Sequence, residues 1–310
     1  MNLQQLEYII AIDTYRHFAQ AAESCFVTQP TLSMMVQKLE DELGLKLFDR
    51  SRQPVEPTAD GVVIISRAKE ILAQVRQLKD FAQEQTHEVS GELHLVVIPT
   101  LAPYVLPFFL NSLVEKHPRL KVFVREATTS RIIEMLKKGE ADLGLLSTPL
   151  NEPQIKEFPL FYEELLAYYT LPGTHHKKLK PGEVDLNNLW LLEEGHCFRS
   201  QVLNYCELQK QSGIEKRLEY EAGSIQTLIN MLDSQPGITI VPQLATYSLS
   251  PAQKKHVIPF VAPQPVREIS LVASVHFSRT KVLEAVRKEI LGKVPAKDIT
   301  GKKVIEITKV

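Results

Sequence analysis

Residues 18–61 read FAQAAESCFVTQPTLSMMVQKLEDELGLKLFDRSRQPVEPTADG, and this stretch decides the fold of the amino-terminal part. A run of alanines lets its first helix pack closely against a second, and Phe26 and Val27 are expected to fill the turn between them. Thr28 offers a side-chain oxygen that can cap the second helix, and Pro30 is tolerated in the first turn of that helix. Gly44 can then end the helix as its C-cap. Two short helices joined by a tight turn indicate a helix-turn-helix, whose second helix can enter a major groove.

The second helix has one apolar face and one polar face. Leu32, Met35 or Val36, and Leu39 are expected to point inward. Glutamine can pair with an adenine edge, and threonine can reach base edges or a thymine methyl group. The alternative is a small helical bundle whose polar face is merely solvated. The residues predicted to contact DNA on this helix are Thr28, Gln29, Pro30, Thr31, Ser33, Met34, Gln37 and Lys38.

The segment after this helix predicts a wing, because LGLKLFDRSRQPVEP reads as two short strands around a loop. Arg50 and Arg52 lie in that loop and suit phosphates and the minor groove. The first sixty residues nevertheless hold nine acidic side chains against five basic ones, and the whole chain has a net charge of -1. DNA binding would therefore rest on a few well-placed cations rather than on a diffuse field.

Residues 18–61 resemble the amino-terminal domain of LysR-type transcriptional regulators. The resemblance implies a winged helix-turn-helix over residues 1–58, with Thr28 to Gln37 as the reading face. It also implies double-stranded promoter DNA as a partner, and RNA polymerase is the expected protein partner of such a regulator.

A long helix is predicted over residues 59–88. An apolar stripe on a helix of about thirty residues, roughly 45 Å long, needs a partner. We expect that partner to be the same helix of a second chain, the alternative being the chain's own effector domain. The resemblance implies a linker helix through which the family dimerises, and a homodimer or homotetramer. The stripe consists of Ile65, Ala68, Leu72, Val75, Leu78 and Ala82.

The remaining two thirds of the chain alternate strand and helix patterns, which predicts an α/β fold with a mostly parallel sheet. The expected elements include strands at LKVFVRE and LLAYYTL and a final helix from about Thr280 to Leu291. Two such halves with chain crossings resemble the periplasmic-binding-protein-like effector domain of the same family. We expect residues 89–162 and 268–300 to form effector subdomain I and residues 163–267 to form subdomain II. Residues 301–310 read as a tail. Sheets of this kind place ligand sites at strand carboxyl ends, between the halves.

The cellular location and the redox state of the cysteines can be predicted from the composition of the chain. The chain has no run of eighteen or more apolar residues, and its start lacks the pattern of a secretory signal. We therefore expect a cytoplasmic protein without a membrane partner. Three cysteines do not make a disulfide framework, and the cytosol keeps thiols reduced. A disulfide here would have to be transient, catalytic or redox-sensing.

Two of the cysteines lie in the stretch GHCFRSQVLNYC at residues 195–206. In a regular helix, nine residues would place the Cα atoms of Cys197 and Cys206 about 13 Å apart on opposite faces. A disulfide needs Cα atoms within about 7 Å, so the segment would have to unwind first. The plain interpretation is two buried helix cysteines. Against it, His196 and Arg199 flank Cys197 and can favour its thiolate, and Gly195 can let a helix begin there.

Three stretches resemble the peroxide-sensing members of the LysR-type family: EEGHCFRSQVLNYC, VIPTLAPYVLP and CFVTQPTLS. The resemblance implies that Cys197 is the peroxidatic cysteine and Cys206 the resolving one, with hydrogen peroxide as the signal. It further implies a regulator rather than an enzyme, with neither cofactor nor metal. The residues expected to line the peroxide pocket are Thr100, Thr129, His196, Arg199 and Arg267.

Two positions depart from that pattern, and other functions compete with it. Ser200 stands where an acidic residue often follows the arginine, and Glu219 stands where a histidine is expected. The main alternative is a LysR-type regulator that binds a small metabolite between its effector subdomains, with structural cysteines. A thiol peroxidase would share the sulfenate chemistry but would not need the DNA-binding module. A solute-binding transport protein would need a signal peptide.

Overall fold

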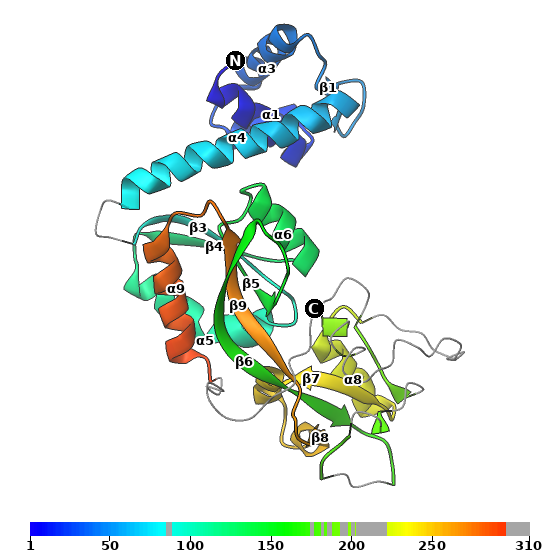
Figure 1. Ribbon diagram of the computed structural model, residues 1–310. Coiled ribbons are helices and arrows are strands. Elements are labelled where there is room, and N and C mark those ends of the chain that lie inside the picture. Colours follow the sequence, from blue (N-terminus) through cyan, green and yellow to red (C-terminus); the bar gives the residue numbers. More distant parts are fainter. Residues whose placement is uncertain are drawn as a thin grey trace. The chain divides into compact units, whose positions relative to one another are not determined.

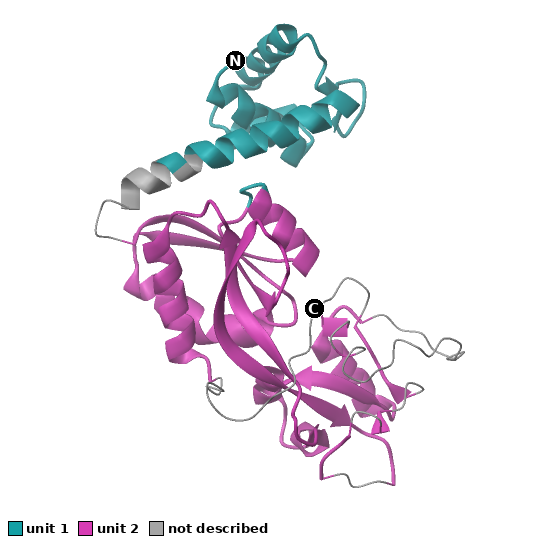
Figure 2. Cartoon of the chain, viewed as in Figure 1, with its two compact units in different colours: residues 1–86, 138–140 teal, residues 87–137, 141–310 magenta. Residues whose placement is uncertain are grey.

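The computed structural model describes residues 1–84, 89–173, 177–180, 183–184, 188–192, 198–199, 202 and 222–295 (Figure 1). The chain divides into two compact units, residues 1–86 with 138–140 and residues 87–137 with 141–310 (Figure 2). Each unit has its own apolar core. None of the described helices combines the length and apolar character that crossing a bilayer requires.

The amino-terminal unit is a helix-turn-helix followed by a small wing and a long helix. Asn2 and Gln5 start the first helix with a reciprocal capping box, in which each side chain accepts a hydrogen bond from the other residue's backbone N–H. The predicted wing is confirmed, because its two short strands pair in antiparallel fashion. The elements are α1 (Leu3–Tyr15), α2 (Phe18–Ser24), α3 (Gln29–Leu43), β1 (Phe48–Asp49), β2 (Glu56–Pro57) and α4 (Ala59–Glu84).

The turn between α2 and α3 differs from the sequence prediction in two ways. Phe26 does not fill the turn, since 96% of its surface is exposed, whereas Val27 packs against the core. Thr28 is the N-cap residue of α3, but its side chain makes no capping hydrogen bond. Its hydroxyl instead lies 2.8 Å from the hydroxyl of Thr31. The position of the N-cap was therefore predicted correctly, but the prediction that the Thr28 side chain forms the capping hydrogen bond was wrong.

The first half of the α4 stripe packs inside its own chain. Ile65 and Ala68 are buried in the core formed with α1, and Leu72 packs at the edge of that core. This part of the stripe therefore serves the helix-turn-helix rather than a second chain, which corrects the single-stripe prediction. Further along, Ile71 and Leu78 are exposed, with 71% of the Leu78 surface accessible.

The second unit is built around a mixed sheet rather than the mostly parallel sheet that was predicted. Among the described strands, the order is β4-β3-β5-β9-β6-β7, with β8 paired to β6. The pairs β3–β4 and β3–β5 are parallel, and the other pairs are antiparallel. The strands are β3 (Gly91–Val97), β4 (Leu120–Glu126), β5 (Leu143–Thr148), β6 (Ile155–Tyr169), β7 (Ile238–Pro242), β8 (Val257–Pro259) and β9 (Val266–Ser274).

The mixed sheet results from two long strands that cross the unit (Figure 1). β6 pairs with β9 over residues 155–164 and then pairs with β7 and β8 over residues 165–169. β6 thus belongs to both halves, and β9 returns beside it in the opposite direction. The predicted chain crossings between two α/β halves are confirmed. The antiparallel pairing of β6 with β9 places Glu163 directly opposite Arg267 where the two strands cross the unit.

Helices cover the sheet. α6 lies close over β5, because an added Cβ at Gly144 would come within 2.7 Å of Ile132 on α6 and of Val272 on β9. α5 contacts α9. The larger helices of the unit are α5 (Ala102–Lys116), α6 (Thr129–Lys137), α8 (Ile225–Ser234) and α9 (Thr280–Lys293), and two 3-10 segments are η4 (Gln243–Ser248) and η5 (Gln253–His256).

Candidate functional site

Arg267 is the centre of a buried polar cluster at the strand crossing. Its side chain has no exposed surface, and its guanidinium lies 2.8 Å from the carboxylate of Glu163 on the paired strand. Nε of Arg267 donates to Oε2 of Glu163 at 2.9 Å, while Oε1 of Glu163 accepts from the backbone N–H of Leu244 at 2.9 Å. A buried charge is tolerated only when it is paired and hydrogen-bonded, and both conditions hold here.

Thr100 joins this cluster from the loop after β3. Nη1 of Arg267 donates to the Thr100 hydroxyl at 3.0 Å, and Nη2 donates to the Thr100 carbonyl oxygen at 3.1 Å. One guanidinium therefore ties together β9, β6 and the loop that leads into α5. The structure brings together two residues that the sequence assigned to one pocket, Thr100 and Arg267. Their role toward peroxide stays a prediction.

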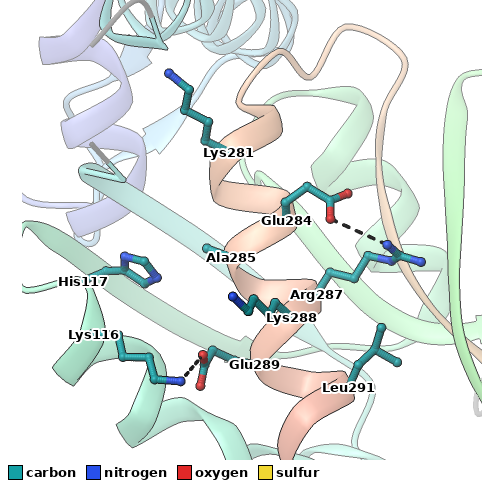
Figure 3. Close-up of a pocket in the computed structure, with 9 residues that line it drawn as sticks. All are labelled: Lys116, His117, Lys281, Glu284, Ala285, Arg287, Lys288, Glu289 and Leu291. Atoms are coloured by element: carbon teal, nitrogen blue, oxygen red, sulfur yellow. Dashed lines mark hydrogen bonds and ion pairs between the residues drawn. The ribbon is translucent and has the colours of Figure 1, made fainter. Parts of the chain in front are cut away.

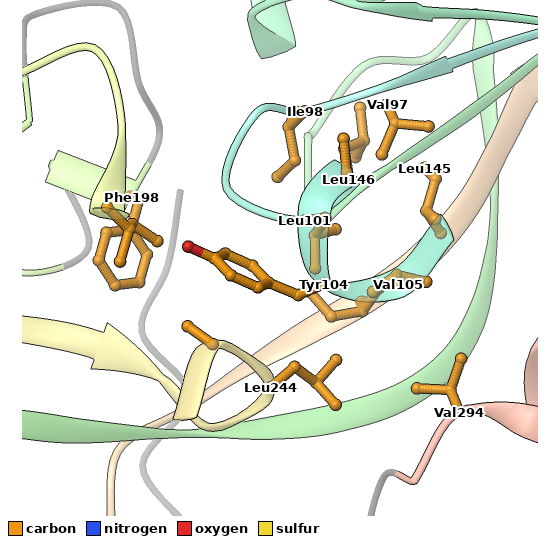
Figure 4. Packing of buried hydrophobic residues seen from close by; sticks show 14 of the residues in the cluster. Val97, Ile98, Leu101, Tyr104, Val105, Leu145, Leu146, Phe198, Leu244 and Val294 are labelled. Atoms are coloured by element: carbon orange, nitrogen blue, oxygen red, sulfur yellow. The ribbon is translucent and has the colours of Figure 1, made fainter. Parts of the chain in front are cut away.

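Phe198 covers the cation and connects the cluster to the cysteine stretch. The guanidinium carbon of Arg267 lies 5.1 Å from the centroid of the Phe198 ring, which is within cation–π range. Phe198 is buried, and the hydroxyl end of Tyr104 points toward its ring (Figure 4). Burial raises the pKa of Tyr104 from 10.0 to about 12, so this phenol keeps its proton even in mildly alkaline solution and remains a hydrogen-bond donor.

Among the other predicted site residues, Arg199 is not hydrogen-bonded to the Arg267 cluster within the described structure, and three further residues lie outside the described part of the chain. Nη1 of Arg199 donates to the carbonyl oxygen of Leu192 at 2.8 Å, so that donor is used within the segment itself. His196, Cys197 and Cys206 lie outside the described residues, as do the two departures from the family pattern, Ser200 and Glu219. The remaining cysteine, Cys25, is partly buried at the end of α2 and packs against the amino-terminal core.

Thr129 begins α6, and its hydroxyl is buried without a hydrogen-bond partner among the described residues. The hydroxyl of Ser147 on β5 is in the same condition. Leaving a buried hydroxyl unpaired costs about 1–3 kcal/mol, so such groups normally bind water or a ligand. No hydrogen bond of the described structure links Thr129 to Arg267. Thr129 is thus available to a ligand but is not part of the Arg267 cluster.

Sequence reasoning missed three members of the cluster: Glu163, Phe198 and Tyr104. Glu163 did carry a signal, because it lies with Glu164 in the otherwise uncharged stretch LFYEELLAYY, where a carboxylate that faces the core needs a buried partner. The partner itself could not be found, because it lies 104 residues away on another strand. Tyr104 and Phe198 look like ordinary core aromatics until the fold places them beside a cation.

The predicted DNA-reading helix has the expected two faces. Leu32, Val36 and Leu39 are fully buried, which settles the choice between Met35 and Val36. Ser33 is partly buried and accepts a hydrogen bond from Arg50. The exposed members of the predicted reading face are Thr28, Gln29, Pro30, Thr31, Met34, Gln37 and Lys38.

The two wing arginines are engaged within the chain. Arg50 pairs with the buried carboxylate of Glu40 at 3.2 Å and lies 5.1 Å over the Phe18 ring. Arg52 pairs with Asp49 at 3.2 Å and with Glu56 at 2.7 Å. Any phosphate they contact must therefore share each cation with a carboxylate, which weakens the attraction. The sequence did not reveal this, because the acidic partners looked like ordinary surface charges.

An open groove lies elsewhere on the second unit, between the end of α5 and α9 (Figure 3). It encloses about 740 Å³ and contains none of the predicted site residues. Two of its cations are paired: Lys116 lies 2.6 Å from Glu289, and Arg287 lies 3.6 Å from Glu284. The groove is therefore mixed in charge.

Comparison with known proteins assigns both units. Residues 3–62 match the family described as bacterial regulatory helix-turn-helix protein, lysR family, and residues 86–294 match the LysR substrate binding domain. The "Hydrogen peroxide-inducible genes activator" of Haemophilus influenzae is 36% identical over 274 residues, which cover 88% of this chain and 90% of that protein.

Solved structures agree. A full-length OxyR variant from Pseudomonas aeruginosa matches with a TM-score of 0.76 and 31% identity, over 96% of this chain and all of that one. An H2O2-bound OxyR variant from Corynebacterium glutamicum matches with a TM-score of 0.61 and 27% identity, over 94% of this chain and 92% of that one. The chain therefore belongs to the LysR family of helix-turn-helix transcriptional regulators and, within it, to the peroxide-sensing OxyR group.

Proposed function

We propose that this regulator senses hydrogen peroxide through Cys197 and Cys206. The Cys197 thiolate attacks one peroxide oxygen, so that an S–O bond forms, the O–O bond breaks and the departing hydroxide takes up a proton to become water. The Cys206 thiol then attacks the sulfenic sulfur, an S–S bond forms and a second water leaves. Two thiols and one peroxide thus give one disulfide and two waters.

The observation that supports this assignment best is the buried Arg267 guanidinium beneath Phe198, the residue that follows Cys197 in the chain. A fixed cation near a thiol favours its thiolate and stabilises the hydroxide that leaves the peroxide. The hydroxyl of Thr100 is held beside that cation, and the unpaired hydroxyl of Thr129 can bind a peroxide oxygen. His196 and Arg199 would add positive charge from the cysteine stretch.

The signal would be a change of shape, because the regular helix that the sequence predicts over residues 197–206 would hold the two cysteines too far apart to bond. Closing a short disulfide loop is worth a few kcal/mol, comparable to an allosteric coupling of 1–3 kcal/mol. The disulfide can therefore shift how the chains of a cytoplasmic homodimer or homotetramer pack. That shift would change promoter contacts made by Thr28 to Lys38 and by the wing, and the recruitment of RNA polymerase.

The proposal is tested by thiol-trapping mass spectrometry of the full chain before and after a mild peroxide dose. We expect a Cys197–Cys206 crosslink and a changed DNA footprint. Cys197→Ser should lose both, Cys206→Ser should stop at a sulfenic acid, and Cys25→Ser should respond as the wild type does. A normal peroxide response in Cys197→Ser would refute the proposal, and a response only to an organic anion would favour a metabolite sensor.

A further inference from the structure

Phe26 occupies a backbone position that suits glycine. Its φ of 55° lies in the left-handed region, which bulky side chains rarely adopt. The backbone N–H of Val27 donates to the carbonyl of Ala22 at 3.0 Å, and that of Phe26 donates to the carbonyl of Glu23 at 3.1 Å. These two bonds form the Schellman motif that ends α2, with Phe26 at the left-handed residue where glycine is most common.

The phenyl ring contributes almost nothing to the fold. It is 96% exposed, while its neighbour Val27 supplies the apolar contact to the core. Two unfavourable features therefore coincide at one residue: a left-handed backbone with a bulky side chain, and a large apolar ring in water. The fold does not require a bulky apolar residue at this strained position. The Phe26 side chain is therefore expected to contact a molecule outside the chain.

The position of Phe26 identifies what it contacts. It lies two residues before Thr28, the N-cap of α3, and the side chains of Gln29 and Thr31 in the first turn of that helix are exposed as its own is. A recognition helix places its amino-terminal residues against base edges. Phenylalanine can make an apolar contact with the methyl group of thymine in the major groove. We infer that Phe26 is a specificity-determining DNA contact that packs on a thymine methyl group. The inference rests on the proposed DNA-reading role of α3.

The test uses the full chain and a duplex that the wild type selects from a random library. Phe26→Ala should weaken binding to that duplex roughly tenfold, the effect of exposing one aromatic side chain. Replacing the half-site thymines by deoxyuridine, one at a time, removes single methyl groups. One such replacement should weaken wild-type binding but leave the binding of Phe26→Ala unchanged. Phe26→Leu should retain part of the sensitivity to that methyl group.

Two controls separate a DNA contact from a structural role. Tyr15 is an exposed aromatic residue of the same unit, and Tyr15→Ala should bind like the wild type. Phe26→Gly suits the left-handed backbone and should raise the melting temperature while it weakens binding. Wild-type affinity in Phe26→Ala, equal methyl sensitivity in both proteins, or a lower melting temperature in Phe26→Gly would each overturn the inference. If the wild type selects no duplex at all, the proposed DNA reading fails instead.

Discussion

Arg267 shows how a single residue can organise the space between two halves of a domain. Its guanidinium contacts Glu163 on β6, Thr100 after β3 and the ring of Phe198, and none of its surface reaches solvent. Each contact comes from a different part of the chain. The free energy of placing this cation in the interior is offset by Glu163, so the two residues must be considered as one unit.

Removing the carboxylate charge should therefore destabilise the second unit strongly. Glu163→Gln leaves Arg267 buried without a counter-charge, and we expect the free energy of unfolding to fall by about 3–5 kcal/mol. Urea denaturation followed by circular dichroism measures this change. Adding Arg267→Met to Glu163→Gln should restore part of the loss, because the uncompensated charge is gone. Glu115→Gln, which alters an exposed carboxylate on α5 of the same unit, should change stability by less than about 1 kcal/mol, and an equal loss there would contradict the pairing argument.

Contacts between individual residues were the feature that the sequence predicted least well. Thr100 and Arg267 could be assigned to one pocket only through a family resemblance, whereas their direct hydrogen bond required the fold. Glu163 and Phe198 could not be placed beside Arg267, because nothing local marks a partner that lies 104 residues away from Glu163 and 69 residues away from Phe198. The exposure of Phe26 was wrongly predicted because apolar residues in tight turns usually pack inward. The left-handed backbone that turns it outward is not visible from composition.

Among the helices and strands, periodic patterns in the sequence located the helices and the buried strands well. The same patterns did not predict how the long strands are arranged. The stretch LKVFVRE is strand β4 itself, and the late helix was predicted from Thr280, where α9 begins. β6 was expected only as LLAYYTL, yet it begins at Ile155. Its first half carries charged residues and a proline, which hide the strand pattern, and pairing with β9 supplies what local preference lacks.

α5 and α9 are joined by a carboxylate whose charge should make the unit sensitive to acid. A hydrogen bond from Lys116 lowers the pKa of Glu289 below its ordinary value of 4.5, and a hydrogen bond from Ser112 lowers it further against the effect of burial. A lowered folded-state pKa means that the stabilisation is present above the unfolded-state value and is lost as pH falls through the folded-state value. Thermal melts between pH 7 and pH 3 should therefore show a steeper decline below about pH 4.5 in the wild type than in Glu289→Gln. Parallel curves would exclude this role for Glu289.

α4 has two apolar faces with different tasks, and point substitutions should separate them. Ile65 is buried against α1, so Ile65→Glu should unfold the amino-terminal unit. Leu78 is 71% exposed, so Leu78→Glu should leave the melting temperature within a few degrees. If the dimer forms through this helix, Leu78→Glu should weaken dimerisation at least tenfold by sedimentation, because burying a charge at an apolar interface is costly. Substituting Glu70, a half-buried residue of the same helix that pairs with Arg67, by alanine is the control. An intact dimer in Leu78→Glu would move the interface elsewhere.

At the scale of the whole molecule, the charge distribution is unusual for a DNA-binding protein. The net charge is -1, and among residues 1–75 every lysine and arginine except Lys38 forms an ion pair within the chain. Arg16 and Lys69 both contact Asp13, Arg50 contacts Glu40, and Arg52 contacts Glu56. Affinity for DNA must then depend more on base and apolar contacts than on counterion release, which scales with the number of phosphates that cations neutralise.

Lys38 should accordingly dominate the salt dependence of DNA binding. Among residues 1–75, whose side chains the structure describes, it is the one lysine or arginine for which no ion pair is present, and it lies on the exposed face of α3. Each phosphate contact contributes about 0.9 to the slope of log affinity against log salt concentration. Lys38→Ala should therefore reduce the slope by about 0.9 per bound chain, whereas Arg52→Ala should reduce it less, because Arg52 is already neutralised by Glu56. Fluorescence anisotropy from 50 to 300 mM salt measures both slopes.

Phe26→Ala should weaken binding at every salt concentration and leave the slope unchanged, since an apolar contact releases no counterions. A larger slope change in Arg52→Ala than in Lys38→Ala would mean that the wing exchanges its internal ion pairs for phosphates on binding.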